Sequence, residues 1–493
     1  MEDQESIIST GITGLDSILA GGLAQGRLYL IEGEPGSGKT TTALQFLSEG
    51  AERGESVLYI TLAESELELR SIARSHGWTL DGIHIHEVIP DERLLDASQQ
   101  YTMFHPSEVE MGDTIRNMVR VVTERKPSRI VLDSLSELKL LAENPLRYRR
   151  QVLALKHFFG TQSCTVYFLD DRGGKSGDMQ VRSIVHGVFS LEQDAKEYGA
   201  ERRRVRVVKY RGVEFRGGYH DYQIRRGGLV VYPRLIAAET RTIMQHPQLK
   251  SGLPRLDALL GGGIEGGTST LLSGPPGTGK SSLAAQFVST ALKDGLCAAM
   301  FLFEESVNNL LLRTEAMKMD LRTALDAGTL ELRQIDPAEL TPGEFVHAVC
   351  ASARAGARVI VIDSLNGFMN AMPDERLLMT HLHELLTYLG QMGVVTLLVG
   401  VQQGMLGSPA TTTLDTSYLA DNIVMLRYFE AMGEVRQTIA VFKKRGGMHE
   451  RTLRRFTLTS EGIEVGEVLR EFEGILTGVP RVNSAPVARE GVA

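Results

Sequence analysis

The stretch GEPGSGKT at residues 33–40 decides the fold, and GPPGTGKS at residues 274–281 repeats its pattern. Both satisfy G-x-x-x-x-G-K-[ST], and an apolar run precedes each one, RLYLIE at 27–32 and TSTLL at 268–272. A strand, a glycine-rich turn and a helix in this order form a loop that wraps the phosphates of a nucleotide. Two complete matches make an incidental glycine-rich turn a negligible alternative.

The residue types of the two loops suit phosphate and magnesium. Glycines let backbone N–H groups face anionic oxygens, each lysine adds charge for the β- and γ-phosphates, and the next hydroxyl is a Mg²⁺ ligand. We predict that ATP binds to Gly33, Glu34, Pro35, Gly36, Ser37, Gly38, Lys39, Thr40 and Thr41. The second predicted set is Gly274, Pro275, Pro276, Gly277, Thr278, Gly279, Lys280, Ser281 and Ser282. Thr40 and Ser281 are the predicted metal ligands.

The sequence around each loop belongs to a tandem duplication. STGITGLDSILAGG at 9–22 aligns without a gap with KSGLPRLDALLGGG at 250–263, and Lys39 and Lys280 keep the same separation of 241 positions. A constant separation over this many matching residues does not arise by chance. We therefore expect a first nucleotide-binding domain over 1–245, a second over 246–480 and a disordered tail over 481–493.

The order of segments within each half indicates the α/β class. Continuous apolar strands alternate with helical stretches, which predicts a mostly parallel twisted sheet flanked by helices. Asp133 and Asp363 end the strands of IVLDSL and IVIDSL. Because ligands bind beyond the carboxyl ends of parallel strands, we expect both carboxylates beside Mg²⁺.

The bulk composition excludes several classes of function. The chain has 493 residues, 42% of them hydrophobic and 23% charged, with a formal net charge of −8. That balance does not favour a broad nucleic-acid surface, and the three scattered cysteines lack metal-ligand spacing. The start MEDQESIIST has no signal-peptide pattern, and no apolar run approaches the ~18 residues of a membrane span. We expect a cytoplasmic protein without membrane contact.

These motifs together resemble the KaiC family of double-domain RecA-like ATPases, which includes a circadian-clock autokinase. The motifs that carry the resemblance are TGLDSILAGGL, PRLDALLGGGI, LFEES, IVIDSLN, VFKKRGGMHE and EFEGILTGVP. They cover the chain from residue 9 to about 480. The resemblance implies two tandem RecA-like P-loop NTPase domains, ATP with Mg²⁺, and a homohexameric double ring with ATP between subunits.

A repeated K-x-R-G motif places two cations together in each half: Lys209 with Arg211, and Lys443 with Arg445. Residues two apart on a strand project from the same face, so each pair presents its charges jointly. The resemblance implies that they reach the γ-phosphate bound by a neighbouring subunit, as arginine fingers do. A solvated basic strand is the alternative for a single copy.

The predicted catalytic carboxylates follow the second strand of each half. Glu304 and Glu305 stand in the second half, and we expect only one of them to face the nucleotide because neighbours on extended chain point oppositely. In the first half Ala63 and Glu64 take the two positions. If the first position holds the base, the first half hydrolyses slowly. If the second position holds the base, Glu64 is sufficient for hydrolysis in the first half.

The resemblance also implies phosphorylation of a loop in the second domain. In MLGSPATTTLDTSYLADNIVML the corresponding positions are Ser417 and Tyr418. Serine is kept, while the tyrosine departs from the family's Ser-Thr pair and puts a two-site phosphorylation cycle in doubt. A polar connector that never meets phosphate is the alternative.

We interpret the chain as an ATP-hydrolysing regulatory protein with Ser/Thr autokinase activity in the second domain. One alternative is a nucleotide-gated scaffold that recruits signalling proteins without phosphorylating itself, which Ala63 and Tyr418 would suit. Another is a RecA-type DNA motor, which the acidic balance, the single tryptophan and the 6% aromatic content disfavour.

Overall fold

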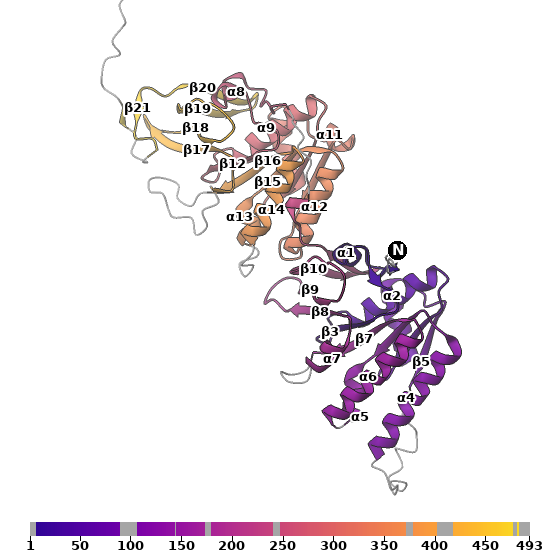
Figure 1. Ribbon diagram of the computed structural model, residues 1–493. Helices are drawn as coiled ribbons and strands as arrows, with labels where there is room; N and C mark the ends of the chain where they lie inside the picture. Colours follow the sequence, from indigo (N-terminus) through magenta and orange to yellow (C-terminus); the bar gives the residue numbers. More distant parts are fainter. Residues whose placement is uncertain are drawn as a thin grey trace, which may run out of the picture. The chain divides into compact units, whose positions relative to one another are not determined.

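The computed structural model describes residues 6–88, 106–142, 144–172, 179–239, 247–370, 378–401, 418–476 and 481–482, with the backbone alone at 106–110, 179–180 and 370. The chain divides into two compact units, Met1–Arg234 and Leu235–Ala493 (Figure 1). Each unit contains one nine-stranded sheet and one copy of the glycine-rich loop.

The first unit is built on a sheet with the strand order β11-β10-β9-β8-β3-β7-β6-β4-β5. The strands from β8 to β5 run parallel, and β9 to β11 continue the sheet as an antiparallel extension. The strands are β1 (Ile7–Ile8), β2 (Leu23–Ala24), β3 (Leu28–Gly33), β4 (Val57–Thr61), β5 (Ile83–Glu87), β6 (Arg129–Asp133), β7 (Thr165–Asp171), β8 (Gly187–Asp194), β9 (Arg202–Tyr210), β10 (Tyr219–Arg225) and β11 (Gly228–Tyr232). The helices are α1 (Thr13–Ile18), α2 (Lys39–Glu52), α3 (Glu66–His76), α4 (Pro106–Arg125), α5 (Leu135–Ala142), α6 (Pro145–Thr161) and α7 (Met179–Ile184).

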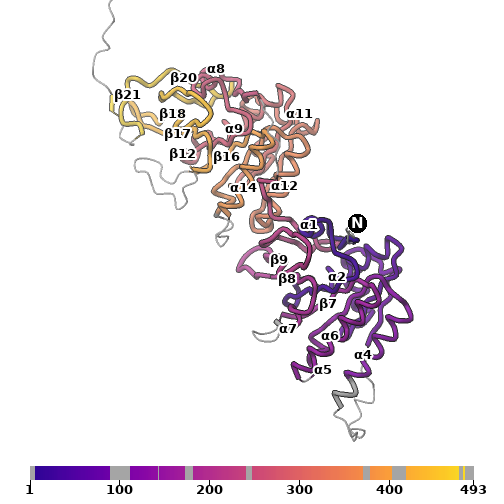
Figure 2. The backbone as a smooth tube through the Cα atoms, viewed as in Figure 1, coloured from indigo at the N-terminus to yellow at the C-terminus, as the bar shows by residue number. Residues whose placement is uncertain are grey.

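The second unit repeats this order as β14-β13-β15-β16-β12-β17-β18-β19-β20, and Figure 2 traces the backbone through both units. The strands are β12 (Ser269–Gly274), β13 (Cys297–Leu302), β14 (Leu330–Gln334), β15 (Ala357–Asp363), β16 (Val395–Val401), β17 (Asn422–Ala431), β18 (Glu434–Lys444), β19 (Arg454–Thr459), β20 (Gly462–Val468), β21 (Phe472–Glu473) and β22 (Arg481–Val482). The helices are η3 (Ala237–Glu239), α8 (Pro254–Leu259), α9 (Lys280–Lys293), α10 (Val307–Ala316), α11 (Arg322–Asp326), α12 (Pro342–Arg354), α13 (Leu365–Asn370) and α14 (Leu378–Gln391).

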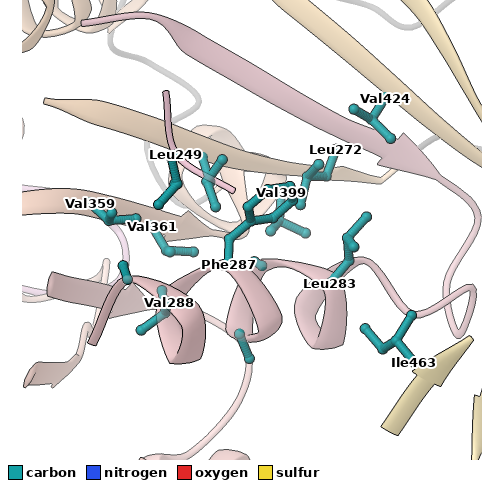
Figure 3. Close-up of a cluster of buried hydrophobic side chains, with 14 of the residues drawn as sticks. Leu249, Leu272, Leu283, Phe287, Val288, Val359, Val361, Val399, Val424 and Ile463 are labelled. Carbon is teal, nitrogen blue, oxygen red and sulfur yellow. The ribbon is translucent and has the colours of Figure 1, made fainter. Parts of the chain in front are cut away.

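Each sheet is covered by helices on both faces, because its central strands are apolar on both faces. In β3, Tyr29 and Ile31 join the core under α2, while Leu28 and Leu30 join the core under α5 and α6. This alternation follows from the two-residue period of a strand. In the second unit Phe287 of α9 packs against the strands (Figure 3). The structure thus confirms the predicted α/β layers.

Two segments lie differently from the predicted domain limits. The sequence places the joint near residue 245, whereas Leu235–Glu239 already belongs to the second unit, where the N–H of Ala237 donates to Glu384 at 2.9 Å. The predicted tail starts at residue 481, but β22 pairs there with β21 through backbone hydrogen bonds. Among the described residues, no helix is long and apolar enough to cross a membrane.

A buried arginine fixes the start of β6 in the first unit. Arg129 has no exposed surface, and its guanidinium binds Glu55 through two contacts of 2.7 and 2.8 Å. It also donates to the carbonyls of Ser9 and Phe46, at 2.9 and 3.0 Å. The charge is therefore paired in the interior, and removing it leaves a carboxylate and two carbonyls without their donor.

We predict that Arg129→Ala lowers the free energy of unfolding of the first unit by about 3 kcal/mol, because a quarter-exposed Glu55 loses its partner. Trp78 is the chain's single tryptophan and packs in this unit, so its fluorescence during urea denaturation reports this unit. The control is Arg70→Ala, which removes an exposed ion pair with Glu66 and should cost at most about 0.5 kcal/mol. Equal losses in both variants would contradict this account.

Candidate nucleotide and magnesium sites

Each glycine-rich loop joins the carboxyl end of a central strand to a helix that begins at the loop lysine. Gly38 and Gly279 precede α2 and α9 with φ of 93° and 90°, and neither helix has a side-chain cap. Only glycine adopts this left-handed backbone at little cost. The first N–H groups of both helices therefore have no capping side chain at the preceding residue, and an anion could accept from them.

In the second unit the predicted lysine and metal ligands lie together. Lys280 is 5% exposed and donates to the Pro275 carbonyl at 2.7 Å. Burial lowers the pKa of Lys280 to about 8, although the carboxylates of Asp363 and Glu304 oppose that shift. Burial raises the pKa of Asp363, and the hydrogen bond from Ser281 partly opposes this rise. These predicted residues therefore share one electrostatic environment.

The two glutamates of the second unit point to different partners. The Glu304 carboxylate accepts a 2.5 Å hydrogen bond from Ser364, the residue after Asp363. Glu305 instead binds the Arg313 guanidinium through both oxygens, at 3.2 and 2.6 Å. The different directions expected for neighbours are therefore seen: Glu304 contacts the residue after the aspartate and Glu305 contacts Arg313, while burial and both carboxylates raise the pKa of Asp363.

In the first unit Lys39 has an additional carboxylate partner. Its ammonium donates to the carbonyls of Gly33 and Glu34, at 2.9 and 3.0 Å, and lies 2.8 Å from Asp171 at the end of β7. Asp133 accepts a 2.5 Å hydrogen bond from Tyr59. Burial raises the pKa of Asp133, while Tyr59 opposes the shift. A bound phosphate would therefore compete with Asp171 for the lysine.

Glu64 lies in this first site, and no ion pair to it is found among the described residues. Its Oε2 atom is buried and has no hydrogen-bond partner among the described residues. Burial, together with the carboxylates of Asp133 and Glu68, raises the pKa of Glu64 to about 7. A carboxyl group with such a pKa is suited to accept a proton near neutral pH.

The Lys and Arg pairs lie at the other end of the central strands. Lys443 donates to the Ala420 carbonyl at 2.7 Å, and Arg445 contacts Asp421 at 3.1 Å. Asp421 in turn accepts from the N–H of Ser269, the first residue of β12. The loop follows the last residue of β12, so the structure does not bring this pair to the loop of its own unit.

The first unit repeats this arrangement with different partners. Lys209 donates to the carbonyls of Arg182 and Val185, at 2.6 and 2.7 Å, and Arg211 donates to Ser183 at 3.0 Å. His186 stands where the second unit has the aspartate, and its Nδ1 accepts from the first residue of β3. Both cations of the first pair therefore contact residues 182–185, and both cations of the second pair contact residues 418–421.

Of the two predicted phosphoacceptors, Ser417 lies outside the described residues. Tyr418 is described, is 57% exposed, and offers its carbonyl to Arg445 at 3.3 Å. Tyr418 therefore lies beside the second Lys and Arg pair, away from the loop of its own unit.

The residues present fit a magnesium nucleotide in the second unit. The Oδ2 atom of Asp363 is buried and has no hydrogen-bond partner in the described part of the chain. A buried carboxylate oxygen of this kind is a ligand that Mg²⁺ accepts directly or through water. The uncapped start of α9 beside it suits the phosphates.

Comparison with known proteins agrees with this geometry. A model of the KaiC ATPase family matches residues 8–236 and 249–470. The chain belongs to the KaiC family. The circadian clock protein KaiC3 of Synechocystis sp. is similar to it, with 29% identity over 492 residues that span 97% of this chain and 96% of that protein. The circadian clock oscillator protein KaiC of Parasynechococcus marenigrum is 26% identical over 484 residues, which span 96% and 93%.

Family membership confirms the predicted resemblance and the tandem RecA-like fold of this KaiC-family chain. Sequence reasoning nevertheless missed Arg313 and Asp171. Arg313 stands eight positions after Glu305, which is about two turns along a helix and was a usable signal. Asp171 is the last residue of β7, the strand that pairs with β3. The two consecutive aspartates that end this apolar run were the usable signal in the sequence.

We predict that Gly279→Ala weakens binding of an ATP analogue at the second site roughly tenfold, about 1.4 kcal/mol. A methyl group at residue 279 would lie 2.9 Å from Leu458 and 3.0 Å from Phe456, and its φ of 90° is strained. Titration of a fluorescent analogue in a Lys39→Ala background measures this site alone. The control Gly295→Ala has a similar φ of 78° with open space around it, and should leave affinity unchanged. Equal effects would remove the loop from the binding site.

Proposed function

We propose that this KaiC-family chain binds and hydrolyses ATP in both halves and phosphorylates its own second domain, as a regulatory protein. The observation that carries the proposal is the repeated grouping at one sheet edge of an uncapped helix start, a lysine and a strand-end aspartate. Phosphoryl transfer depends mainly on positioning and on charge stabilisation, which these groups supply.

The reaction requires a proton acceptor as well as phosphate-binding groups. An oxygen of water or of a hydroxyl forms a bond to the γ-phosphorus, the bond from that phosphorus to the β,γ-bridging oxygen breaks, and ADP leaves with the electron pair. A carboxylate takes or orients the proton of the attacking group. In the second half Glu304 has the place for this role, because it lies beside Ser364 and shares the environment of Lys280.

Magnesium, when bound, neutralises charge that develops on the phosphate oxygens. Asp363 and Ser281 would hold it in the second half, and Asp133 with Thr40 in the first. The loop lysines bind the β- and γ-phosphate oxygens and orient them. The Mg²⁺ requirement thus rests on a buried aspartate oxygen and a neighbouring hydroxyl.

The position of the Lys and Arg pairs supports nucleotide sites between subunits. Five residue steps from Ser269 to Gly274, at about 3.3 Å each, separate the two ends of β12 by about 16 Å. An arginine anchored at the first end therefore does not reach phosphate at the other end of its own domain. We infer that Lys209, Arg211, Lys443 and Arg445 serve neighbouring copies, in the homohexamer that family resemblance implies.

The same geometry bears on autophosphorylation. The carbonyl of Tyr418 adjoins Arg445, so this residue lies near the end of β12 that is remote from the loop of its own unit. A phosphate on this segment would then come from ATP held by the next subunit. We favour Ser417 as the acceptor. Tyr418 and Ala63 are the features that favour a scaffold which binds ATP to assemble and recruits signalling proteins.

We predict that Lys280→Ala abolishes incorporation of phosphate from γ-labelled ATP, because the second site loses its phosphate-binding cation. Labelling followed by phosphopeptide mapping measures the effect and identifies the acceptor. Lys39→Ala is the matched control and should retain labelling. Undiminished labelling in Lys280→Ala would remove the kinase activity from the second domain, and no labelling of the unaltered chain would favour the scaffold.

We further predict that removal of nucleotide lowers the oligomeric state, because ATP would bridge subunits. Mass photometry with and without ATP and Mg²⁺ measures the change. The double variant Lys39→Ala with Lys280→Ala should remain dissociated when ATP is added. A monomer at micromolar concentration in the presence of ATP and Mg²⁺ would contradict the ring.

A further inference from the structure

The glutamate pairs of the two halves stand at the same place in the fold but have different surroundings. Ser65 and Ser306 cap the helices that follow, α3 and α10, and each accepts a hydrogen bond from the N–H three residues on. Positions counted from these caps are therefore equivalent. Eight residues after the second glutamate, Ile72 of the first half stands where the second half has Arg313.

Arg313 donates hydrogen bonds to both carboxylate oxygens of Glu305 and to one further side chain. Its Nη1 donates to the hydroxyl of Ser282, two residues after the loop lysine, at 2.6 Å. The side chains of Arg313 and Glu305 are 29% and 26% exposed, so the pair is partly shielded from water. A fork that binds both carboxylate oxygens fixes their direction. Glu305 is therefore held toward α10 by Arg313 of that helix, which a hydrogen bond to Ser282 also ties to α9.

With Glu305 held in this way, Glu304 is the carboxylate left for the site. Its contact with Ser364 places it next to the strand-end Asp363. The Glu304 carboxylate also favours the charged form of Lys280, so the carboxylate and the loop lysine lie close together.

The first half reverses both features. Ala63 offers no carboxylate at the first position, and Ile72 is an apolar residue packed on the core. The hydroxyl of Thr41, which corresponds to Ser282, lies 3.3 Å from His76 Nε2 instead of an arginine. Glu64 consequently has a buried oxygen that contacts no hydrogen-bond partner in the described part of this unit, and the Asp133 carboxylate is among its neighbours.

We propose that the two halves use opposite members of the glutamate pair as the proton acceptor, and that the residue at position 72 or 313 decides which. Arg313 withdraws Glu305, so Glu304 acts in the second half. Ile72 leaves Glu64 unbound, so Glu64 acts in the first half and compensates for Ala63. This inference rests on the proposed ATP hydrolysis, and Arg313 and Ile72 are positioning residues that act through the glutamates.

The first test moves the arginine into the first half. In a Lys280→Ala background, which leaves only the first site, Glu64→Gln and Ile72→Arg should each lower ATP hydrolysis about 10²-fold. An arginine at position 72 would bind Glu64 as Arg313 binds Glu305. The control Ser71→Arg adds the same charge at an exposed position of α3 and should keep the rate within about twofold. Nucleotide binding and Trp78 fluorescence verify that the variants are folded.

The second test removes the arginine from the second half. In a Lys39→Ala background, Glu304→Gln should lower hydrolysis about 10²-fold. Adding Arg313→Ile should then restore at least about a tenth of the lost activity, because Glu305 is released. Recovery of this kind is not expected from a residue that only stabilises the fold. This test also stands if Ile72→Arg fails to fold.

The outcomes separate this inference from the proposed function. If neither single-site background hydrolyses ATP, both are wrong. If both backgrounds hydrolyse ATP but Glu64→Gln has no effect, or Arg313→Ile restores nothing to Glu304→Gln, the function stands and the division of roles is wrong.

Discussion

Both sites depend on a helix start that the protein leaves unsatisfied. The first N–H groups of a helix need acceptors, and α3 and α10 obtain them from the side chains of Ser65 and Ser306. The helices that follow the glycine-rich loops receive no such cap, since Gly38 and Gly279 have no side chain to offer. A phosphate would supply such acceptors. The strand, the turn and the lysine are arranged around these uncapped N–H groups.

The features that could be predicted from sequence are those fixed by local chain geometry or by repetition. The loops, the strand-end aspartates and the sheet class follow from residue order. Because the sequence is duplicated, each of these features could be predicted twice, once in each half. The choice between Glu304 and Glu305 was not predicted, because it depends on Arg313 folding back from the following helix α10 onto one of the two glutamates. Asp171 was missed for the same reason, since it meets Lys39 only when two strands lie side by side.

Duplication kept the backbone of the two halves alike while the side-chain partners changed. The central strands begin with an N–H that is accepted by His186 in one half and by Asp421 in the other. Asp421 also pairs with Arg445, whereas Arg211 donates to a carbonyl. The same backbone position thus carries a different electrostatic environment in each half, which is the physical basis on which two similar domains can acquire different chemistry.

The buried arginine of β6 limits how the two halves could exchange sequence. Counted back from the strand-end aspartates, the position of Arg129 is held in the second half by Val359, which is 1% exposed. Counted forward from the loop lysines, Leu296 stands at the position of Glu55. A gene rearrangement that joined β6 to the second half would enclose a guanidinium among apolar side chains, and the reverse exchange would leave a carboxylate without its cation. Folding itself would therefore select against recombination between the repeats, and this lets their sequences drift apart.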